Sequence, residues 1–213
     1  MPLWRGRWKA IGGKMTGIED VLAFWFGGLG ESEPVPSVRF DLWFSGAGAT
    51  DQQIREGFAV DVERAGAGDY DGWAGSPRGT LALLVLLDQF PRNIYRGSSR
   101  AYAFDDKARE FCLQGLVTGQ DRELITVERV FFYLPLEHAE DRDLQRRSVA
   151  VFAELLRQAP EPLREACRGF LDYAERHRAI IERFGRFPHR NAPLSRPSTA
   201  EELAFLRLPG SSF

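Results

Sequence analysis

Residues 81–97 read LALLVLLDQFPRNIYRG, and the apolar first half of this stretch decides the fold class. Ser76 and Pro77 precede it, and they mark a helix start because serine caps helices and proline suits the first helical position. Nearly every side chain from 81 to 87 is apolar, which predicts a helix buried on most sides. Pro91 is expected to end this helix, since the residue before a proline avoids the α region.

Helix signals recur on both sides of this stretch, whereas strand signals do not. The expected helices cover 17–26, 51–65 behind a Thr50 cap, 78–88, 98–118, a segment from Thr126 that Pro135 interrupts, 141–158, 162–184, and a last helix capped by Ser198 with Glu201. The fold class is therefore all-α, with seven or eight helices in antiparallel succession. Because no linker divides the chain, we expect a loose leader at 1–16 and a single domain at 17–213.

Composition excludes several classes of protein. Among 213 residues the net charge is −2, so the totals give no sign of the basic face that nucleic-acid binding needs. No apolar run approaches the roughly 20 residues of a membrane helix. Cys112 and Cys167 lie far apart without zinc spacing, which is typical of a reducing cytosol. We therefore expect a cytoplasmic protein with no cofactor and no membrane partner; the oligomeric state is not indicated.

The first of three polar segments follows the buried helix. Asp88 stands at its C-terminal end, where the helix dipole disfavours a carboxylate. Such an acid needs a cationic partner, which Arg92, Arg96 or Arg100 could supply. Of the 28 basic residues only three are lysines, and arginine forks suit carboxylate and phosphate groups, although codon usage explains such a bias equally well. The segment is either part of a site or an ion pair that locks a turn.

The second segment, 134–145, places Glu137, His138, Glu140 and Asp141 within five residues. On a continuous helix His138 would share a face with Asp141 and Gln145. The group suits acid–base chemistry or the solvated start of a helix. A metal site is not expected, because no paired-histidine spacing is present.

The third segment, 177–191, contains the other two histidines. His177 lies on the apolar stripe of a long helix, a position that usually holds a core histidine. His189 and Arg190 follow Pro188 in a loop, where functional residues are more frequent.

We expect the three segments to line one pocket that binds a small anionic molecule or a peptide carboxylate. The candidate catalytic residues are His138, Glu137 and His177. The candidate ligand-binding residues are Asp88, Gln89, Arg92, Asn93, Arg96, Gln145, Arg186, His189, Arg190 and Asn191. One alternative is a hydrolase or lyase whose histidine base is oriented by Glu137 or Asp88. The other is an interaction scaffold whose polar turns are structural.

Several motifs resemble a mainly bacterial family known as domain of unknown function nine-two-four. They are VLAFWFG at 21–27, LALLVLLDQFPRNIYRG at 81–97, AYAFDDKAR at 101–109, FFYLPLEHAED at 131–141, HRAIIERFGRFPHRN at 177–191 and STAEELAFL at 198–206. The resemblance implies a right-handed superhelix similar to tetratricopeptide proteins and no established activity. Ala139 stands where the family pattern has serine, and Ser195 where it has glycine.

Overall fold

The structure is a computed structural model that describes residues 16–31, 33–46 and 48–211. Within these ranges the chain forms helices and no strand, which confirms the all-α fold class. The α-helices are α1 (Ile18–Phe26), α2 (Ser37–Phe44), α3 (Gly48–Ala67), α4 (Pro77–Leu84), α5 (Phe90–Ile94), α6 (Asp105–Thr118), α7 (Thr126–Glu137), α8 (Arg142–Gln158), α9 (Arg164–Phe184) and α10 (Ala200–Phe205). Residues 1–15 of the expected leader lie outside the described residues, and the superhelical arrangement stays a prediction.

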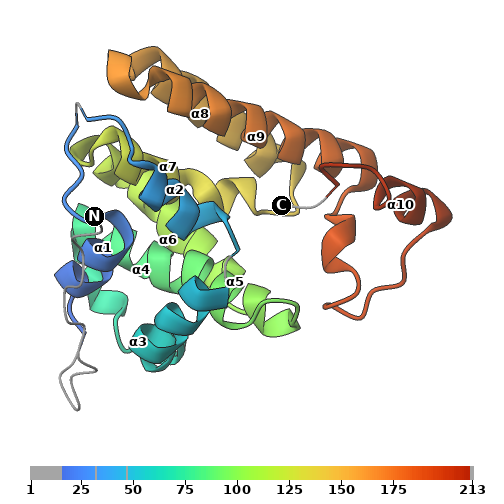
Figure 1. Cartoon of the computed structure of the whole chain (residues 1–213), viewed down its shortest axis with the longest axis horizontal. Coiled ribbons are helices and arrows are strands. Elements are labelled where there is room, and N and C mark those ends of the chain that lie inside the picture. The colour runs from blue at the N-terminus through green and yellow to red at the C-terminus, as the bar shows by residue number, and fades with distance from the viewer. Residues whose placement is uncertain (1–15, 32, 47, 212–213) are drawn as a thin grey trace.

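The long helices α8 and α9 form an antiparallel pair that runs along one edge of the molecule (Figure 1). Helix α7 packs under α8, and α4 contacts α1, α6 and α7. The short helix α10 and the chain that precedes it pack near the C-terminal end of α9 through Phe184 and Phe205. Several helix ends therefore meet between the α8–α9 pair and the rest of the molecule.

The buried helix predicted at 78–88 forms the centre of the core. Ser76 caps α4 by accepting a hydrogen bond from the amide of Gly79, as the sequence predicts. All seven side chains from Leu81 to Leu87 are at most 1% exposed. Burying an aliphatic side chain contributes about 1.5–3 kcal/mol, so this segment is a main source of stability.

The predicted end of this helix at Pro91 is wrong. Residues Val85–Gln89 form a π-helical turn, in which the amide of Phe90 donates to the carbonyl of Val85, and the chain continues into α5. Pro91 is the second residue of α5, so its missing N–H lies in a first turn that has no helical acceptor for it. The wide π turn thus allows the helix to continue beyond the proline. Such turns are frequent at functional sites.

Four other predicted boundaries differ from the structure. Pro135 does not interrupt α7, because the surrounding residues are all buried and their packing outweighs a proline cost of about 3 kcal/mol. Helix α3 begins before Thr50, and a 3₁₀ turn at Ser99–Tyr102 precedes α6. The last helix is capped by Thr199 paired with Glu202, one residue beyond the predicted pair. Cap motifs are short and overlap, so the packed register selects one.

Ser195 has a left-handed backbone with φ of 55°. Glycine adopts this region without the penalty that a Cβ atom brings. We expect Ser195→Gly to raise the free energy of unfolding by about 0.5–1 kcal/mol, measured by denaturant unfolding. Ala192→Gly, in the same loop with ordinary φ, should lower it; equal changes in both variants would contradict this explanation.

Candidate functional site

Side chains from six helices and turns meet in one place, which we call the histidine–arginine cluster. Its members are Asp88 from the π turn, Arg92 from α5, Asp105 from α6, Glu137 and His138 from the end of α7, His177 from α9, and Arg190 from the 3₁₀ turn Pro188–Arg190. The sequence places these residues up to about a hundred positions apart, so the fold alone brings them together.

The centre of the cluster is a carboxylate–imidazole pair. Nδ1 of His138 lies 2.8 Å from Oδ1 and 2.9 Å from Oδ2 of Asp88. Burial would raise the pKa of Asp88, yet the charge of Arg92 and the hydrogen bond from His138 hold it well below its usual range. Asp88 is therefore ionised, and Nδ1 must carry the proton that it donates to the carboxylate.

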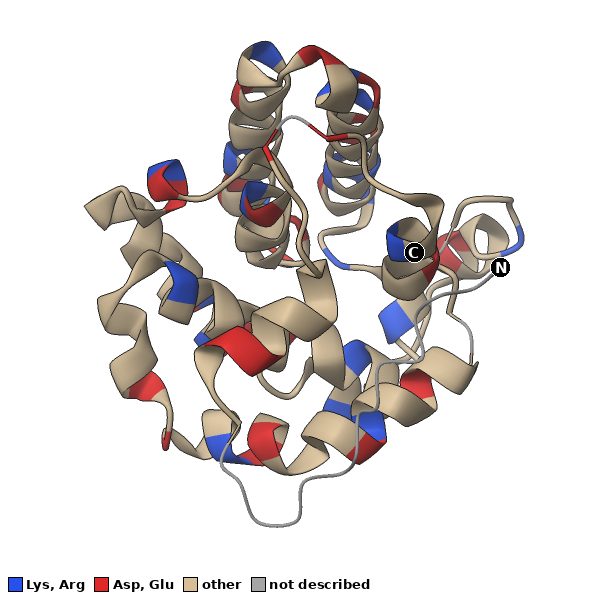
Figure 2. Ribbon diagram, turned by 60° about the vertical axis from the view of Figure 1, so that its left-hand side comes forward, with Lys and Arg blue, Asp and Glu red and all other residues tan. Residues whose placement is uncertain are grey.

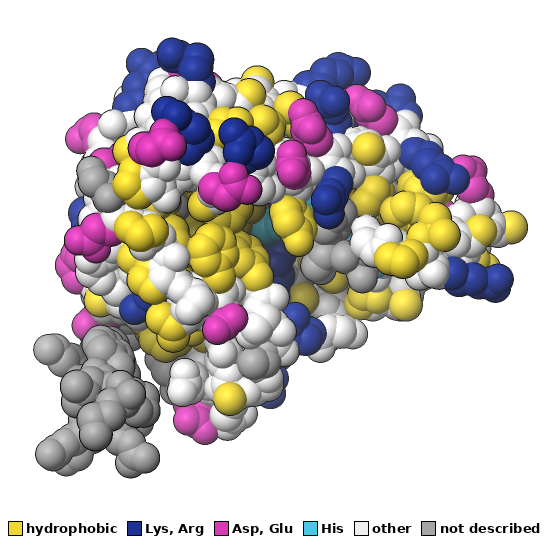
Figure 3. Space-filling view, turned by 45° about the horizontal axis from the view of Figure 1, so that its top comes forward, with side chains coloured by type: hydrophobic (Ala, Val, Ile, Leu, Met, Phe, Trp, Pro, Cys, Tyr) yellow, Lys and Arg dark blue, Asp and Glu magenta, His cyan; other side chains and the backbone are white. Residues whose placement is uncertain are grey.

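The other ring nitrogen of His138 is accessible. Within the described part of the chain Nε2 makes no hydrogen bond, and it is absent from the polar atoms that are both buried and unpaired. The side chain is 14% exposed, whereas that of Asp88 is 1% exposed. Figure 3 shows histidine atoms at the bottom of a recess flanked by hydrophobic side chains.

His138 is neutral at pH 7. Burial lowers its pKa and the charge of Arg92 lowers it further, against the opposing effect of Asp88. A neutral imidazole with its proton on Nδ1 has a free lone pair on Nε2. The geometry therefore supplies a proton acceptor that solvent can reach.

Two arginines lie beside this pair. Arg92 donates from Nη1 and Nη2 to the two oxygens of Asp105, at 2.9 and 3.0 Å, and from Nη1 to the backbone carbonyl of Asp88 at 2.6 Å. Arg190 donates from Nη1 to the carbonyl of His138 at 3.0 Å and to Asp105 at 3.4 Å. Asp105 therefore links both guanidinium groups and fixes their positions.

A second buried pair lies next to the first. Oε1 of Glu137 is 3.2 Å from Nδ1 of His177, which also donates to the carbonyl of Tyr173 at 2.8 Å. Burial, together with the charge of Asp88, raises the pKa of Glu137 to about 8. Burial and the proximity of His138 lower the pKa of His177 to about 3. At pH 7 this pair is mainly a carboxylic acid and a neutral imidazole. The ring centre of His177 lies 6.2 Å from that of His138.

The comparison with known proteins follows this geometry. The family described as "Bacterial protein of unknown function (DUF924)" matches residues 21–210. The chain belongs to this family. It is similar to the solved structure of a protein of unknown function, ATU0120, from Agrobacterium tumefaciens, with 37% identity over 89% of this chain and 96% of that one and a TM-score of 0.76. Comparison with curated proteins gives no match.

In this DUF924 protein several predicted ligand-binding residues lie outside the cluster. Asn93 and Arg96 both bond to Asp51 at the start of α3. Arg186 is paired with Glu202, and Asn191 donates to Ser198. Each of these polar groups has a local partner in the part of the chain that the structure describes, so their placement gives no support for ligand contacts.

Three other predicted residues support the cluster from its border. Gln89 donates to the carboxylate of Asp88. Gln145 donates to the carbonyls of Glu137 and Ala139, at 2.6 and 2.8 Å, where α7 ends. Because α7 ends there, the expected continuous helix with His138, Asp141 and Gln145 on one face does not exist. His189 packs against Phe187, and burial followed by the charge of Arg190 lowers its pKa to about 4.

The sequence did not indicate two residues of the candidate site. Asp105 binds both arginines, and the ring of Tyr102 lies 4.8 Å from Cζ of Arg190. Both belong to the AYAFDDKAR motif at 101–109, so the motif was visible but carried no histidine or glycine pattern that indicates chemistry.

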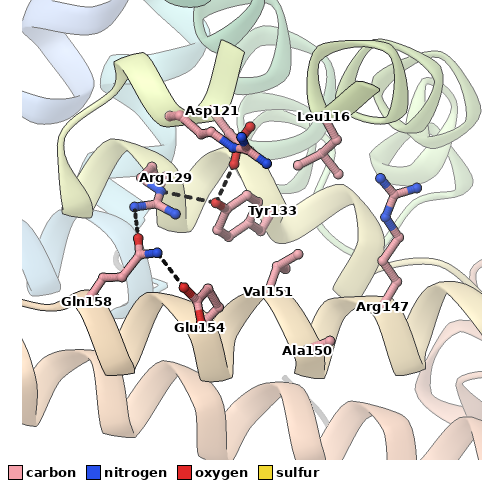
Figure 4. Close-up of a pocket in the computed structure, with 10 residues that line it drawn as sticks. Leu116, Asp121, Arg129, Tyr133, Arg147, Ala150, Val151, Glu154 and Gln158 are labelled. Atoms are coloured by element: carbon pink, nitrogen blue, oxygen red, sulfur yellow. Dashed lines mark hydrogen bonds between the residues drawn. The ribbon is translucent and has the colours of Figure 1, made fainter. Parts of the chain in front are cut away.

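A separate hollow of about 520 Å³ lies between α6, α7 and α8. Tyr133 donates to Asp121 there, while Arg129 and Gln158 close one side (Figure 4). It contains no member of the histidine–arginine cluster. We place the candidate site at the histidine–arginine cluster, because the volume of this hollow does not by itself indicate a reaction.

The distribution of charge and of metal-ligating side chains bears on other kinds of site. Basic and acidic residues are interspersed along the helices (Figure 2). In the described ranges no three histidine, cysteine or acidic side chains are grouped to hold a metal ion, and no helix is both long and apolar enough to cross a membrane.

Proposed function

We propose that the protein is an enzyme of the hydrolase or lyase class, in which His138 is the general base for a small anionic substrate. The observation that carries this proposal is the Asp88–His138 pair, because both carboxylate oxygens hold Nδ1 and leave Nε2 open to solvent. A positioned general base typically accelerates a reaction 10²–10⁴-fold.

The roles of the residues follow from their contacts. Nε2 of His138 takes a proton from a water, hydroxyl or acidic C–H group that is bound in the recess. Asp88 fixes the tautomer of the ring and stabilises the imidazolium that forms. Arg92 and Arg190 favour a negative charge that develops nearby, and Asp105 keeps them in place.

The convergence of these groups favours an enzyme over a scaffold. Buried charges in a scaffold are normally paired so that none faces an opening. Here Asp88 is fully buried while the side chain of its histidine partner is partly exposed. The anion-binding pocket predicted from the sequence is the second candidate. The charges of Arg92 and Arg190 are offset by those of Asp88 and Asp105, so the support for this pocket comes from the hydrogen-bond donors of Arg190 that remain unused.

Chemical modification tests the base without a known substrate. Diethyl pyrocarbonate acylates neutral, accessible imidazole nitrogens, so at pH 7 we expect mass spectrometry to find His138 modified at least ten times faster than His177, which is 4% exposed. Nitrogen NMR of the imidazoles should show His138 protonated on Nδ1 near neutral pH.

Activity provides the second arm of the test. The substrates to be tried are esters, amides and phosphoesters that carry a carboxylate. For any of them that the protein turns over, we expect His138→Gln to lower kcat/KM at least 100-fold. The control Asp51→Asn, at a carboxylate outside the cluster, should change it less than threefold. An unreactive His138 with its proton on Nε2 would refute the proposal.

A further inference from the structure

Arg190 uses only part of its hydrogen-bonding capacity. Within the described chain it donates through Nη1 alone, and its Nε atom is buried without any partner. The residue is 6% exposed, so this unpaired donor lies where an unmade hydrogen bond destabilises the protein.

The unused donors form one edge of the guanidinium group. Nε and Nη2 point the same way, and this edge binds two oxygens of a carboxylate side by side. In the part of the chain that the structure describes, four other arginines use the same edge in this manner: Arg78 on Glu19, Arg96 on Asp51, Arg157 on Glu154, and Arg186 on Glu202. At Arg190 no carboxylate of the described chain takes that place.

The surroundings of Arg190 restrict how a ligand approaches. The ring centres of Tyr102 and Phe187 lie 4.8 and 4.5 Å from its Cζ atom. These rings cover the guanidinium group, so a ligand reaches the free edge in the plane of the group. Nη1 is bonded to the carbonyl of His138, which anchors the guanidinium group beside the residue that carries the proposed base.

Among the residues that the structure describes, Arg190 has no carboxylate to itself. Burial lowers its pKa to about 10, with a further contribution from the positive charge of Arg92. Asp105 opposes this effect, but it is shared with Arg92 through two shorter bonds. A ligand with one negative charge would therefore stabilise the site, whereas a dianion would also be repelled by Asp88 and Asp105.

From these observations we propose that the Nε–Nη2 edge of Arg190 is a carboxylate subsite, and that the substrate is a small monocarboxylic acid anion. The inference rests on the proposed function, because the bound acid is a substrate only if His138 acts on it. Arg190 is then the group that holds the substrate. The charges of Asp88 and Asp105 favour a monocarboxylate over inorganic phosphate, because phosphate is partly a dianion near neutral pH and is repelled more strongly.

The first measurement is a titration of the wild-type protein with acetate, benzoate and inorganic phosphate. Nitrogen NMR should show a saturable shift of the Nε–H signal of Arg190 with a carboxylate. We expect Arg190→Lys, which keeps the charge and lacks the fork, to bind the carboxylate at least tenfold more weakly. Arg96→Lys is the matched control, because Asp51 already occupies its edge, and it should bind as the wild type does.

The second measurement separates this inference from the proposed function. A saturating carboxylate should slow the modification of His138 by diethyl pyrocarbonate at least fivefold in the wild type and not in Arg190→Lys. His138→Gln should keep carboxylate binding, because Arg190 contacts only the backbone carbonyl of that residue.

The outcomes are distinct. An unreactive His138 together with an intact Arg190 shift would remove the general base and keep the subsite. A reactive His138 with no Arg190 shift, or with no protection by carboxylate, would overturn the subsite alone. Binding of phosphate but not of carboxylates would overturn the assigned substrate class.

Discussion

Replacing Asp88 with asparagine is expected to lower the free energy of unfolding by about 3 kcal/mol. The carboxylate is 1% exposed and balances Arg92 and the donor of His138. Removing one member of a buried charged pair leaves the other without compensation, which is costly in a low-dielectric interior. For a chain of this length, thermal unfolding should shift down by roughly 6–12 °C.

The control for this substitution is Asp51→Asn. Asp51 also binds an arginine with both oxygens, but Arg96 is 52% exposed, so the pair is well solvated. Exposed pairs contribute about 1 kcal/mol or less. A loss in Asp88→Asn no larger than in Asp51→Asn would show that the cluster does not need the Asp88 charge.

The second large effect concerns pH and Glu137. In the folded protein Glu137 keeps its proton up to about pH 8, whereas the unfolded chain loses it near 4.5. The folded state therefore binds more protons between these values, and the contribution to stability falls as pH rises through this window. His177 acts in the opposite direction, because its pKa is about 3 when folded and 6.5 when unfolded, so stability rises with pH up to about 6.5. The slopes of Glu137 and His177 cancel between about pH 4.5 and 6.5, and His189, whose pKa is lowered to about 4, adds a rise in stability over that range.

We therefore expect maximum stability near pH 6.5 and a loss of about 2 kcal/mol between pH 6.5 and 8. Glu137→Gln should remove most of this alkaline loss, measured by urea unfolding at a series of pH values. Glu140→Gln is the control: the pKa of Glu140 is lowered despite burial, through its bonds to Arg196 and Phe187, so this variant should be less stable yet retain the alkaline loss. An undiminished loss in Glu137→Gln would show that Glu137 is ionised in the folded protein.

The helices could be predicted because their signals are local. The apolar run at 81–87 and the Ser76–Pro77 cap act within a few residues, and the structure confirms both. The errors occurred where packing overrides local preference, at Pro91 and Pro135. A proline rule describes an isolated helix, whereas a π turn or a fully buried helix changes the balance.

The candidate site was predictable only in part. The sequence showed that Asp88 needs a cation and offered Arg92, Arg96 and Arg100. The structure selects Arg92, four residues on, because the π turn and α5 carry its side chain back to Asp88. Arg96 pairs with Asp51 and Arg100 with Glu63, two carboxylates of α3 that no spacing within residues 81–97 could reveal.

By itself the sequence determined that this chain buries one apolar helix among others and concentrates its histidines in three polar segments. Only the tertiary structure decided which imidazole receives a carboxylate, which arginine edge remains unpaired and which acid is held neutral. Helix formation depends on neighbours along the chain, but these properties depend on distances of a few ångströms between groups that the chain brings together from remote positions.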